Sequence, residues 1–187
     1  MAVLVTGGAR SGKSSFAEKL AMHRNQRGIY IATCLAEDEE MKERVGLHQQ
    51  MRLQAGFPWE TREEPYALVD ELNKLQESGE GAVVLVDCLT LWLTNWLLYY
   101  EASSYAAEHV GKRIDELVQA VASHPGQVIL VTNEVGDGIV PEYPLGRQFR
   151  DLAGRMNQRL AAVCEEVFLV TVGIPVELKS RAYVFET

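Results

Sequence analysis

Near the amino terminus, eight residues have the types and spacing of a phosphate-binding loop. They satisfy the pattern G-x-x-x-x-G-K-[ST], which a chain of this length matches by chance in about one per cent of cases or fewer. Glycines let backbone N–H groups converge on phosphate oxygens, while the lysine reaches the β/γ oxygens and the final hydroxyl ligates Mg²⁺. The sequence therefore predicts that these residues bind a nucleoside triphosphate. The loop consists of Gly7, Gly8, Ala9, Arg10, Ser11, Gly12, Lys13 and Ser14.

An acidic residue that could complete the metal site stands at the end of another apolar run. Residues 82–87 read Ala-Val-Val-Leu-Val-Asp and predict a buried strand that ends at Asp87. A phosphate-binding loop of this type needs such a carboxylate for its Mg²⁺. We therefore expect Ser14 and Asp87 to be the metal-site residues, with a simple strand-end cap as the alternative for Asp87.

One of the four histidines has unusual neighbours in the sequence. Glu40, Arg44, His48 and Arg52 recur every four residues, which would place them along one face of a helix. Two guanidiniums beside an imidazole could gather a polyphosphate around it and favour its neutral, nucleophilic form. From spacing alone, a solvated helix face remains the stronger interpretation. The other three histidines have ordinary surroundings in helices or turns: His23, His109 and His124.

The positions of these residues require a sheet with crossover connections. Five short apolar runs predict buried parallel strands, at 3–6, 28–33, 82–87, 127–132 and 166–172. The stretches between them are long enough for helices, at about 13–24, 36–54, 65–76, 91–122 and 145–165. The 187 residues show no linker or repeat. We therefore expect one doubly wound α/β domain over residues 1–187, with a mostly parallel sheet flanked by helices.

Three further features have two readings each. Residues 134–144 follow a strand and hold two glycines and two prolines, so they could form a wall of the site or an irregular connector. The arginines of residues 147–159 could contact phosphates or another subunit, although a surface helix is favoured. Trp92 and Trp96 are better explained by core or subunit packing than by cofactor binding.

Composition excludes several classes of protein. The net charge of −8 argues against a nucleic-acid partner, which would require a broad basic surface. The three cysteines are odd in number and include no C-x-x-C pair, which indicates reduced thiols and a cytoplasmic location. No apolar run has the length of a membrane span, so stable membrane insertion is not expected.

The order of these segments resembles that of a known family, the bifunctional adenosylcobinamide kinase/adenosylcobinamide-phosphate guanylyltransferases. The similarity extends from Val3 to about Gly173, and the string at 131–141 together with the histidine segment makes it specific. It is carried by residues 6–14, 30–33, 40–48, 59–65, 94–95, 131–141 and 157–160.

The resemblance implies two reactions of cobalamin assembly. First, the terminal phosphate of ATP or GTP is transferred to the aminopropanol hydroxyl of adenosylcobinamide. Second, GMP from GTP is joined to adenosylcobinamide phosphate through a guanylylated histidine, at the position of His48, with release of pyrophosphate. It also implies a RecA-like P-loop fold, Mg²⁺ and a homotrimer with nucleotide near the subunit boundaries. Further nucleotide contacts carried over by motif position are Ala32, Thr33, Cys34, Gln49, Gln50, Met51, Arg52, Glu63 and Asp87.

Two other functions stay open from the residues alone. A small-molecule kinase would use the same loop without forming a covalent nucleotide at His48. A nucleotide-binding switch or regulatory ATPase would turn over nucleotide slowly without consuming an acceptor. The guanine-specific N-K-x-D signature is absent from the sequence, which weakens the reading as a switch GTPase.

Overall fold

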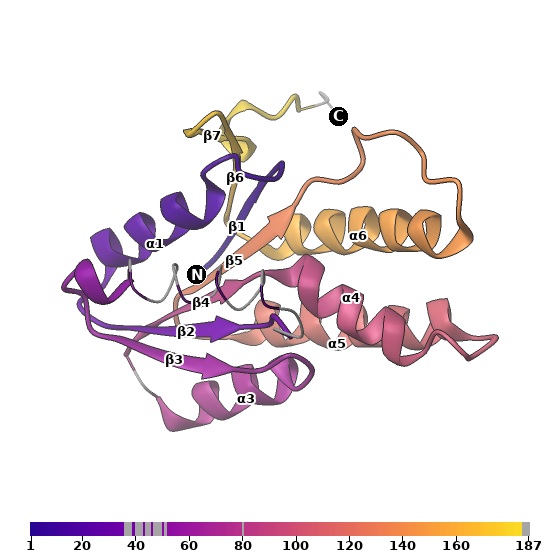
Figure 1. Ribbon diagram of the computed structural model, residues 1–187. Coiled ribbons are helices and arrows are strands. Elements are labelled where there is room, and N and C mark those ends of the chain that lie inside the picture. The colour runs from indigo at the N-terminus through magenta and orange to yellow at the C-terminus, as the bar shows by residue number, and fades with distance from the viewer. Residues whose placement is uncertain are drawn as a thin grey trace.

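The computed structural model describes residues 1–35, 39, 43, 46, 50, 52–79 and 81–184. Helices and strands alternate through most of this range (Figure 1). In chain order the elements are β1 (Ala2–Gly7), α1 (Lys13–Arg24), β2 (Gly28–Ala32), β3 (Trp59–Glu63), α3 (Leu68–Ser78), β4 (Val83–Asp87), α4 (Leu89–Tyr99), α5 (Ala106–Ser123), β5 (Val128–Asn133), α6 (Pro144–Val163), β6 (Glu166–Thr171), β7 (Ile174–Glu177) and the 3-10 turn η1 (Lys179–Arg181).

These strands form one sheet in the order β3-β2-β4-β5-β1-β6-β7. All neighbouring strands are parallel except β6 and β7, which pair antiparallel. The strand that leads into the phosphate-binding loop, β1, lies between β5 and β6. Strand β5 lies between β1 and β4. Asp87, at the end of β4, therefore reaches the same carboxyl edge of the sheet as the loop, with one strand between them.

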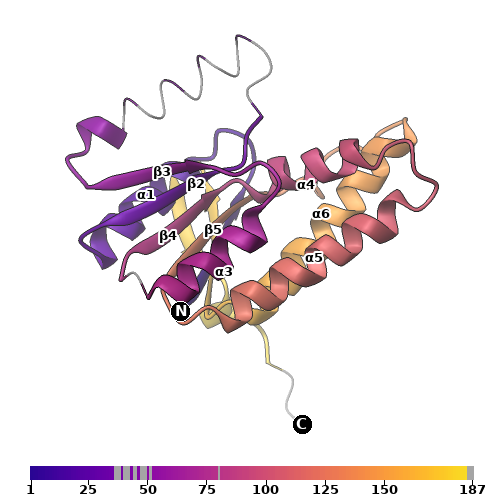
Figure 2. The ribbon, with the colours of Figure 1, turned by 90° about the horizontal axis from the view of Figure 1, so that it is seen from below.

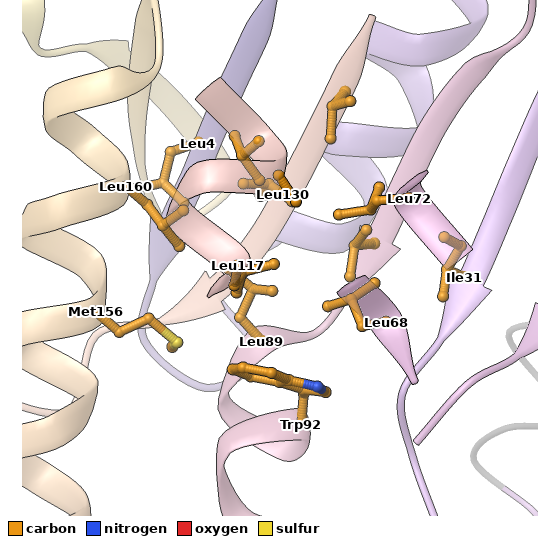
Figure 3. Packing of buried hydrophobic residues seen from close by; sticks show 14 of the residues in the cluster. Leu4, Ile31, Leu68, Leu72, Leu89, Trp92, Leu117, Leu130, Met156 and Leu160 are labelled. Atoms are coloured by element: carbon orange, nitrogen blue, oxygen red, sulfur yellow. The ribbon is translucent and has the colours of Figure 1, made fainter. Parts of the chain in front are cut away.

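Helices cover both faces of the sheet. Helix α1 packs on one face, and α3, α4, α5 and α6 lie on the other (Figures 1 and 2). The larger core lies on the second face, where side chains from alternate strand positions meet leucines of the four helices (Figure 3). Burying such side chains stabilises the fold by about 1.5–3 kcal/mol for each Leu or Val, before the opposing chain entropy. The site at the sheet edge therefore rests on a rigid three-layer support.

The expected fold class is confirmed, and so are all five expected strands. Two strands were missed, β3 and β7, because both lie at sheet edges and do not read as continuous apolar runs. The helix expected over 91–122 is instead two helices, α4 and α5. In the turn between them, the Ser103 hydroxyl accepts a hydrogen bond from the Tyr105 N–H. Most of the helix expected over 36–54 falls outside the described residues.

No helix within the described ranges combines the length and the apolar character needed to cross a bilayer.

Candidate functional site

The phosphate-binding loop joins β1 to α1 in the expected way. Gly7 ends the strand and Lys13 begins the helix. The Lys13 side chain is buried, and its Nζ donates to the Gly8 carbonyl oxygen at 3.2 Å. The ammonium is therefore folded back over the loop, at the amino end of α1, where the helix dipole also favours an anion.

Two glycines of this loop are required by its geometry. Gly12 has φ 94°, in the left-handed region that side chains rarely adopt. A Cβ on Gly7 would lie 2.4 Å from the Val170 carbonyl oxygen and 2.6 Å from the Ser11 hydroxyl. Arg10, a non-glycine residue, is also held at φ 57°. The loop is thus a close-packed turn whose backbone path requires glycine at both positions.

The turn between β6 and β7 packs against the phosphate-binding loop. The Gly173 N–H donates to the Ser11 carbonyl oxygen at 2.8 Å. A Cβ on Gly12 would lie only 3.2 Å from the Cα of Gly173. The carboxyl-terminal hairpin therefore helps to fix the phosphate-binding loop.

Asp87 stands where the metal carboxylate is expected. It pairs with Val131 on β5, which pairs in turn with Val5 on β1. Two strand spacings put β4 about 10 Å from β1 at this level. Asp87 and the loop therefore lie at the same edge of the sheet, on either side of β5.

The donor set fits Mg²⁺ bound together with a nucleotide. In the described part of the chain, no three His, Cys, Asp or Glu side chains gather as a self-sufficient metal site. Mg²⁺ commonly takes only one or two protein ligands and fills its octahedron with phosphate oxygens and water. The Ser14 hydroxyl and the Asp87 carboxylate are oxygen ligands of this kind.

Buried polar side chains hold the ends of β2 and β4 together. The Thr33 hydroxyl donates to the Cys88 carbonyl oxygen at 2.7 Å and accepts from the Cys88 N–H at 3.0 Å. The Asn95 amide donates to the carbonyl oxygens of Thr33 and Pro65, at 2.9 and 3.0 Å. Thr33 is therefore a structural tie, and Asn95 of the Thr94-Asn95 motif helps to fix the end of β2, while the Thr94 hydroxyl donates to the Thr90 carbonyl oxygen within α4.

A second set of amide and hydroxyl groups fixes the end of β5. The Asn133 amide donates to the Thr90 hydroxyl at 2.6 Å. On the other side, the Asn157 amide donates to the Asn133 carbonyl oxygen at 3.2 Å, and Thr132 donates to Asn157 at 2.8 Å. In the sequence, Thr132, Asn133 and Asn157 stand out only as part of the family resemblance. Together they join β5 to α4 and α6 beneath the site.

A charged and aromatic cluster lies on the α1 face of the sheet beside Asp87. The Tyr30 hydroxyl donates to Asp87 Oδ2 at 3.2 Å, and the Arg52 guanidinium stacks 3.6 Å from the centre of the Tyr30 ring. Arg52 also pairs with Glu18 at 3.5 Å. The pKa of Glu18 is raised overall. Burial is the main cause and the charge of Asp87 adds to it, while the charge of Arg52 acts in the opposite direction. In the sequence, Tyr30 stands out only as part of the segment 30–33 that carries the family resemblance, and Glu18 does not stand out at all.

The remaining expected site residues fall into three groups. Ala32 ends β2 and Glu63 ends β3, and Thr33 and Cys34 follow β2, so all four lie at the carboxyl edge of the sheet. Gln50 is exposed, and Arg52 is buried. Three expected residues lie outside the described residues: His48, Gln49 and Met51.

The irregular segment after β5 begins against the phosphate-binding loop. The Glu134 N–H donates to the Gly7 carbonyl oxygen at 3.1 Å. Arg147 donates to the carbonyl oxygens of Pro141 and Glu142, and Arg150 donates to that of Gly136. Two arginines of α6 therefore hold this segment in place. Its role as a wall of the site stays a prediction.

Packing and turn contacts account for both tryptophans and for two of the histidines. Trp92 is fully buried and donates to the Tyr66 carbonyl oxygen, and Trp96 stacks with Tyr100. These contacts confirm packing roles for both tryptophans. Among the histidines, His109 stacks on Tyr100, and His124 accepts from the Gly126 N–H at the end of α5.

Reactivity of the cysteines gives a direct test of the nucleotide site. Cys34 is half-buried, whereas burial raises the pKa of Cys88 and raises that of Cys164 to about 12. We expect a disulfide reagent at pH 8 to modify one thiol quickly in the native protein, and GTP with Mg²⁺ to slow that reaction at least several-fold. In Cys34→Ser the fast phase should vanish. A fast phase that GTP leaves unchanged would contradict a nucleotide contact at Cys34.

This chain is similar to known proteins along nearly its whole length. Residues 3–178 match the family described as cobinamide kinase / cobinamide phosphate guanyltransferase. The chain is 44% identical to the bifunctional adenosylcobalamin biosynthesis protein CobU of Escherichia coli K12, covering 96% of this chain and 100% of that protein. It is 42% identical to the bifunctional adenosylcobalamin biosynthesis protein CobP of Pseudomonas aeruginosa, covering 95% and 97%.

Solved structures with low sequence identity share the fold. An ATPase from a bacterial type III secretion system superposes with a TM-score of 0.53 at 12% identity, over 98% of this chain and 58% of that one. A protein designated PH0250 from Pyrococcus horikoshii gives a TM-score of 0.52 at 11% identity, over 95% and 85%. These similarities confirm a RecA-like P-loop fold and show nothing about the substrate.

Proposed function

Because this chain belongs to the cobinamide kinase / cobinamide phosphate guanyltransferase family, we propose that its P-loop drives phosphorylation of adenosylcobinamide and that His48 carries GMP in the second reaction. The observation that supports this most directly is the ordered loop with the buried Lys13, one strand away from Asp87 on the same edge. That arrangement suits charge neutralisation along a triphosphate.

In the kinase reaction, the substrate hydroxyl attacks the γ-phosphorus. A new O–P bond forms as the bond to the β-phosphate oxygen breaks, the nucleoside diphosphate leaves, and the hydroxyl proton passes to solvent. Lys13 neutralises charge on the β/γ oxygens, and the backbone N–H groups of the loop hold the phosphates in line. This step needs positioning and charge and no covalent intermediate.

In the guanylyl transfer, an imidazole nitrogen of His48 attacks the α-phosphorus of GTP, and pyrophosphate leaves. A phosphate oxygen of adenosylcobinamide phosphate then attacks the same phosphorus, which releases His48 and forms adenosylcobinamide-GDP. Splitting the transfer avoids bringing two large anions together in one step. The nucleotide contacts proposed at the strand ends, Ala32, Cys34 and Glu63, would hold the nucleotide while this occurs, whereas Thr33 is fully buried and would support them as a structural tie.

Mg²⁺, when bound with the nucleotide, would neutralise phosphate charge and orient the leaving oxygen. Ser14 and Asp87 are the residues proposed to hold it. Asp87 would act through its carboxylate at the end of β4, and Ser14 through its hydroxyl in the first turn of α1.

A cytoplasmic homotrimer is proposed as the working form. None of Cys34, Cys88 and Cys164 forms a disulfide, which is compatible with a reducing compartment. Val172, Ile174 and Val176, on the edge strand β7 and the turn before it, expose apolar side chains that could be buried between subunits. The nucleotide would then lie near the subunit boundary.

A covalent GMP distinguishes this function from both alternatives. After incubation with GTP and Mg²⁺, intact-mass measurement at alkaline pH should show one added GMP per chain, since a phosphoramidate survives alkali. Addition of adenosylcobinamide phosphate should then remove it. A simple kinase or a regulatory ATPase would gain no such mass, and that result would refute the proposed second reaction.

A further inference from the structure

Asp87 has a hydrogen-bond partner that the kinase mechanism does not use. The Tyr30 hydroxyl donates to its Oδ2 oxygen at 3.2 Å from the neighbouring strand β2. Tyr30 is 5% exposed, and burial followed by the charge of Asp87 raises its pKa well above the usual value. The buried phenol therefore holds its O–H against the carboxylate away from bulk water.

The ring of Tyr30 is held by neighbours on two elements. Trp59 on β3 makes an edge-to-face contact, with ring centres 6.1 Å apart. The Arg52 guanidinium lies 3.6 Å from the ring centre, a close cation–π distance. With the ring held in this way, the hydroxyl has little freedom to leave Asp87.

Arg52 is itself committed to this cluster. It is 5% exposed, and Glu18 of α1 lies 3.5 Å from its Nη1. The guanidinium is therefore held by its charge contact with Glu18 as well as by stacking on the Tyr30 ring. The resemblance suggested Arg52 as a nucleotide contact, but its surroundings in the fold are the Tyr30 ring and Glu18.

We propose that Tyr30 is a positioning residue for the metal site: its hydroxyl orients the Asp87 carboxylate toward the metal ion of the bound nucleotide, and Arg52 keeps the ring in place. The role rests on the proposed assignment of Asp87 to that metal ion. Partners of this kind fix the direction of a metal-ligating carboxylate, and removing one commonly lowers metal affinity about 10–100-fold. Arg52 then acts through Tyr30 and not on the phosphates.

The test measures GTP affinity by calorimetry with Mg²⁺ and again with EDTA, and Mn²⁺ binding by electron paramagnetic resonance in the presence of GTP. Tyr30→Phe keeps the ring and removes only the hydroxyl. It should weaken Mn²⁺ binding about 10-fold and reduce the gain in GTP affinity that Mg²⁺ provides, while GTP affinity in EDTA stays unchanged. Tyr105→Phe, at an exposed tyrosine, is the matched control and should match the parent.

Arg52→Lys keeps the charge but loses the flat guanidinium that stacks on Tyr30. It should shift metal binding in the same direction as Tyr30→Phe and add little to it in the double variant. Weaker GTP binding in EDTA would overturn the role of Arg52, because it would indicate a direct phosphate contact.

Asp87→Asn separates the two proposals. If this variant loses the Mg²⁺-dependent gain while Tyr30→Phe keeps all of it, the positioning role of Tyr30 is wrong and the metal assignment stands. If Asp87→Asn itself keeps the full gain, the assignment of Asp87 to the metal is wrong, and the role of Tyr30 falls with it.

Discussion

Replacement of His48 by alanine is expected to abolish labelling of the protein by GTP that carries a label in its α-phosphate. Loss of a nucleophile should lower the guanylyl-transfer rate at least about 1000-fold. Phosphorylation of adenosylcobinamide should continue at a measurable rate, because attack at the γ-phosphorus relies on Lys13 and the metal. The measurement is a pair of assays on one preparation, label incorporation and formation of adenosylcobinamide phosphate.

His23→Ala is the matched control, since His23 is an exposed histidine in the last turn of α1. It should retain both reactions. The label on the parent protein should resist alkali and be released by acid, as a phosphoramidate does. If His48→Ala still becomes labelled, or loses the kinase reaction as fully as the transferase reaction while folded, the division of roles between the two steps is wrong.

Replacement of Lys13 by alanine should impair both reactions together. The buried ammonium lies over the loop next to the Gly8 carbonyl oxygen, where it would meet the β/γ oxygens of the nucleotide. Removing one partner of such a buried charge contact costs about 2–5 kcal/mol, so GTP affinity should fall roughly 30-fold or more. Equilibrium binding of GTP is the measurement.

Lys19→Ala provides the comparison, because Lys19 is an exposed lysine on the same helix. Its GTP affinity should stay within about twofold of the parent, as expected for a screened surface charge. Parent-like binding and turnover by Lys13→Ala would remove the phosphate-binding role of the loop.

The fold and the phosphate-binding loop could be predicted because their signals are local. Residues 83–87 and 128–133 are buried on both faces of a parallel sheet, so they read as apolar runs whatever lies elsewhere in the chain. The loop is equally local, since a strand, a glycine-rich turn and a helix follow one another within residues 2–24.

The surroundings of Asp87 could not be predicted because they depend on tertiary contacts. Glu18, Tyr30 and Arg52 come from one helix, one strand and one later segment, and their proximity follows from β2 lying beside β4. A regular four-residue spacing placed Arg52 on a helix face with His48, but only the fold shows that its guanidinium is buried against an aromatic ring. The edge strands were missed for a related reason, since a strand with one solvent-facing side can carry charges such as those of Trp59–Glu63.

The position of β1 in the sheet has a consequence for synthesis of the protein. Among the strands of this sheet β1 is translated before the others, yet its two neighbours begin at Val128 and Glu166. At about 5–20 residues per second, a ribosome needs roughly 8–33 s after β1 before both neighbours exist. The turn at Gly173, which hydrogen-bonds to Ser11, comes later still. The phosphate-binding loop is therefore translated well before the strand and turn that complete its surroundings, and a nascent chain interrupted before β6 carries the motif without β6 and without the contact from Gly173.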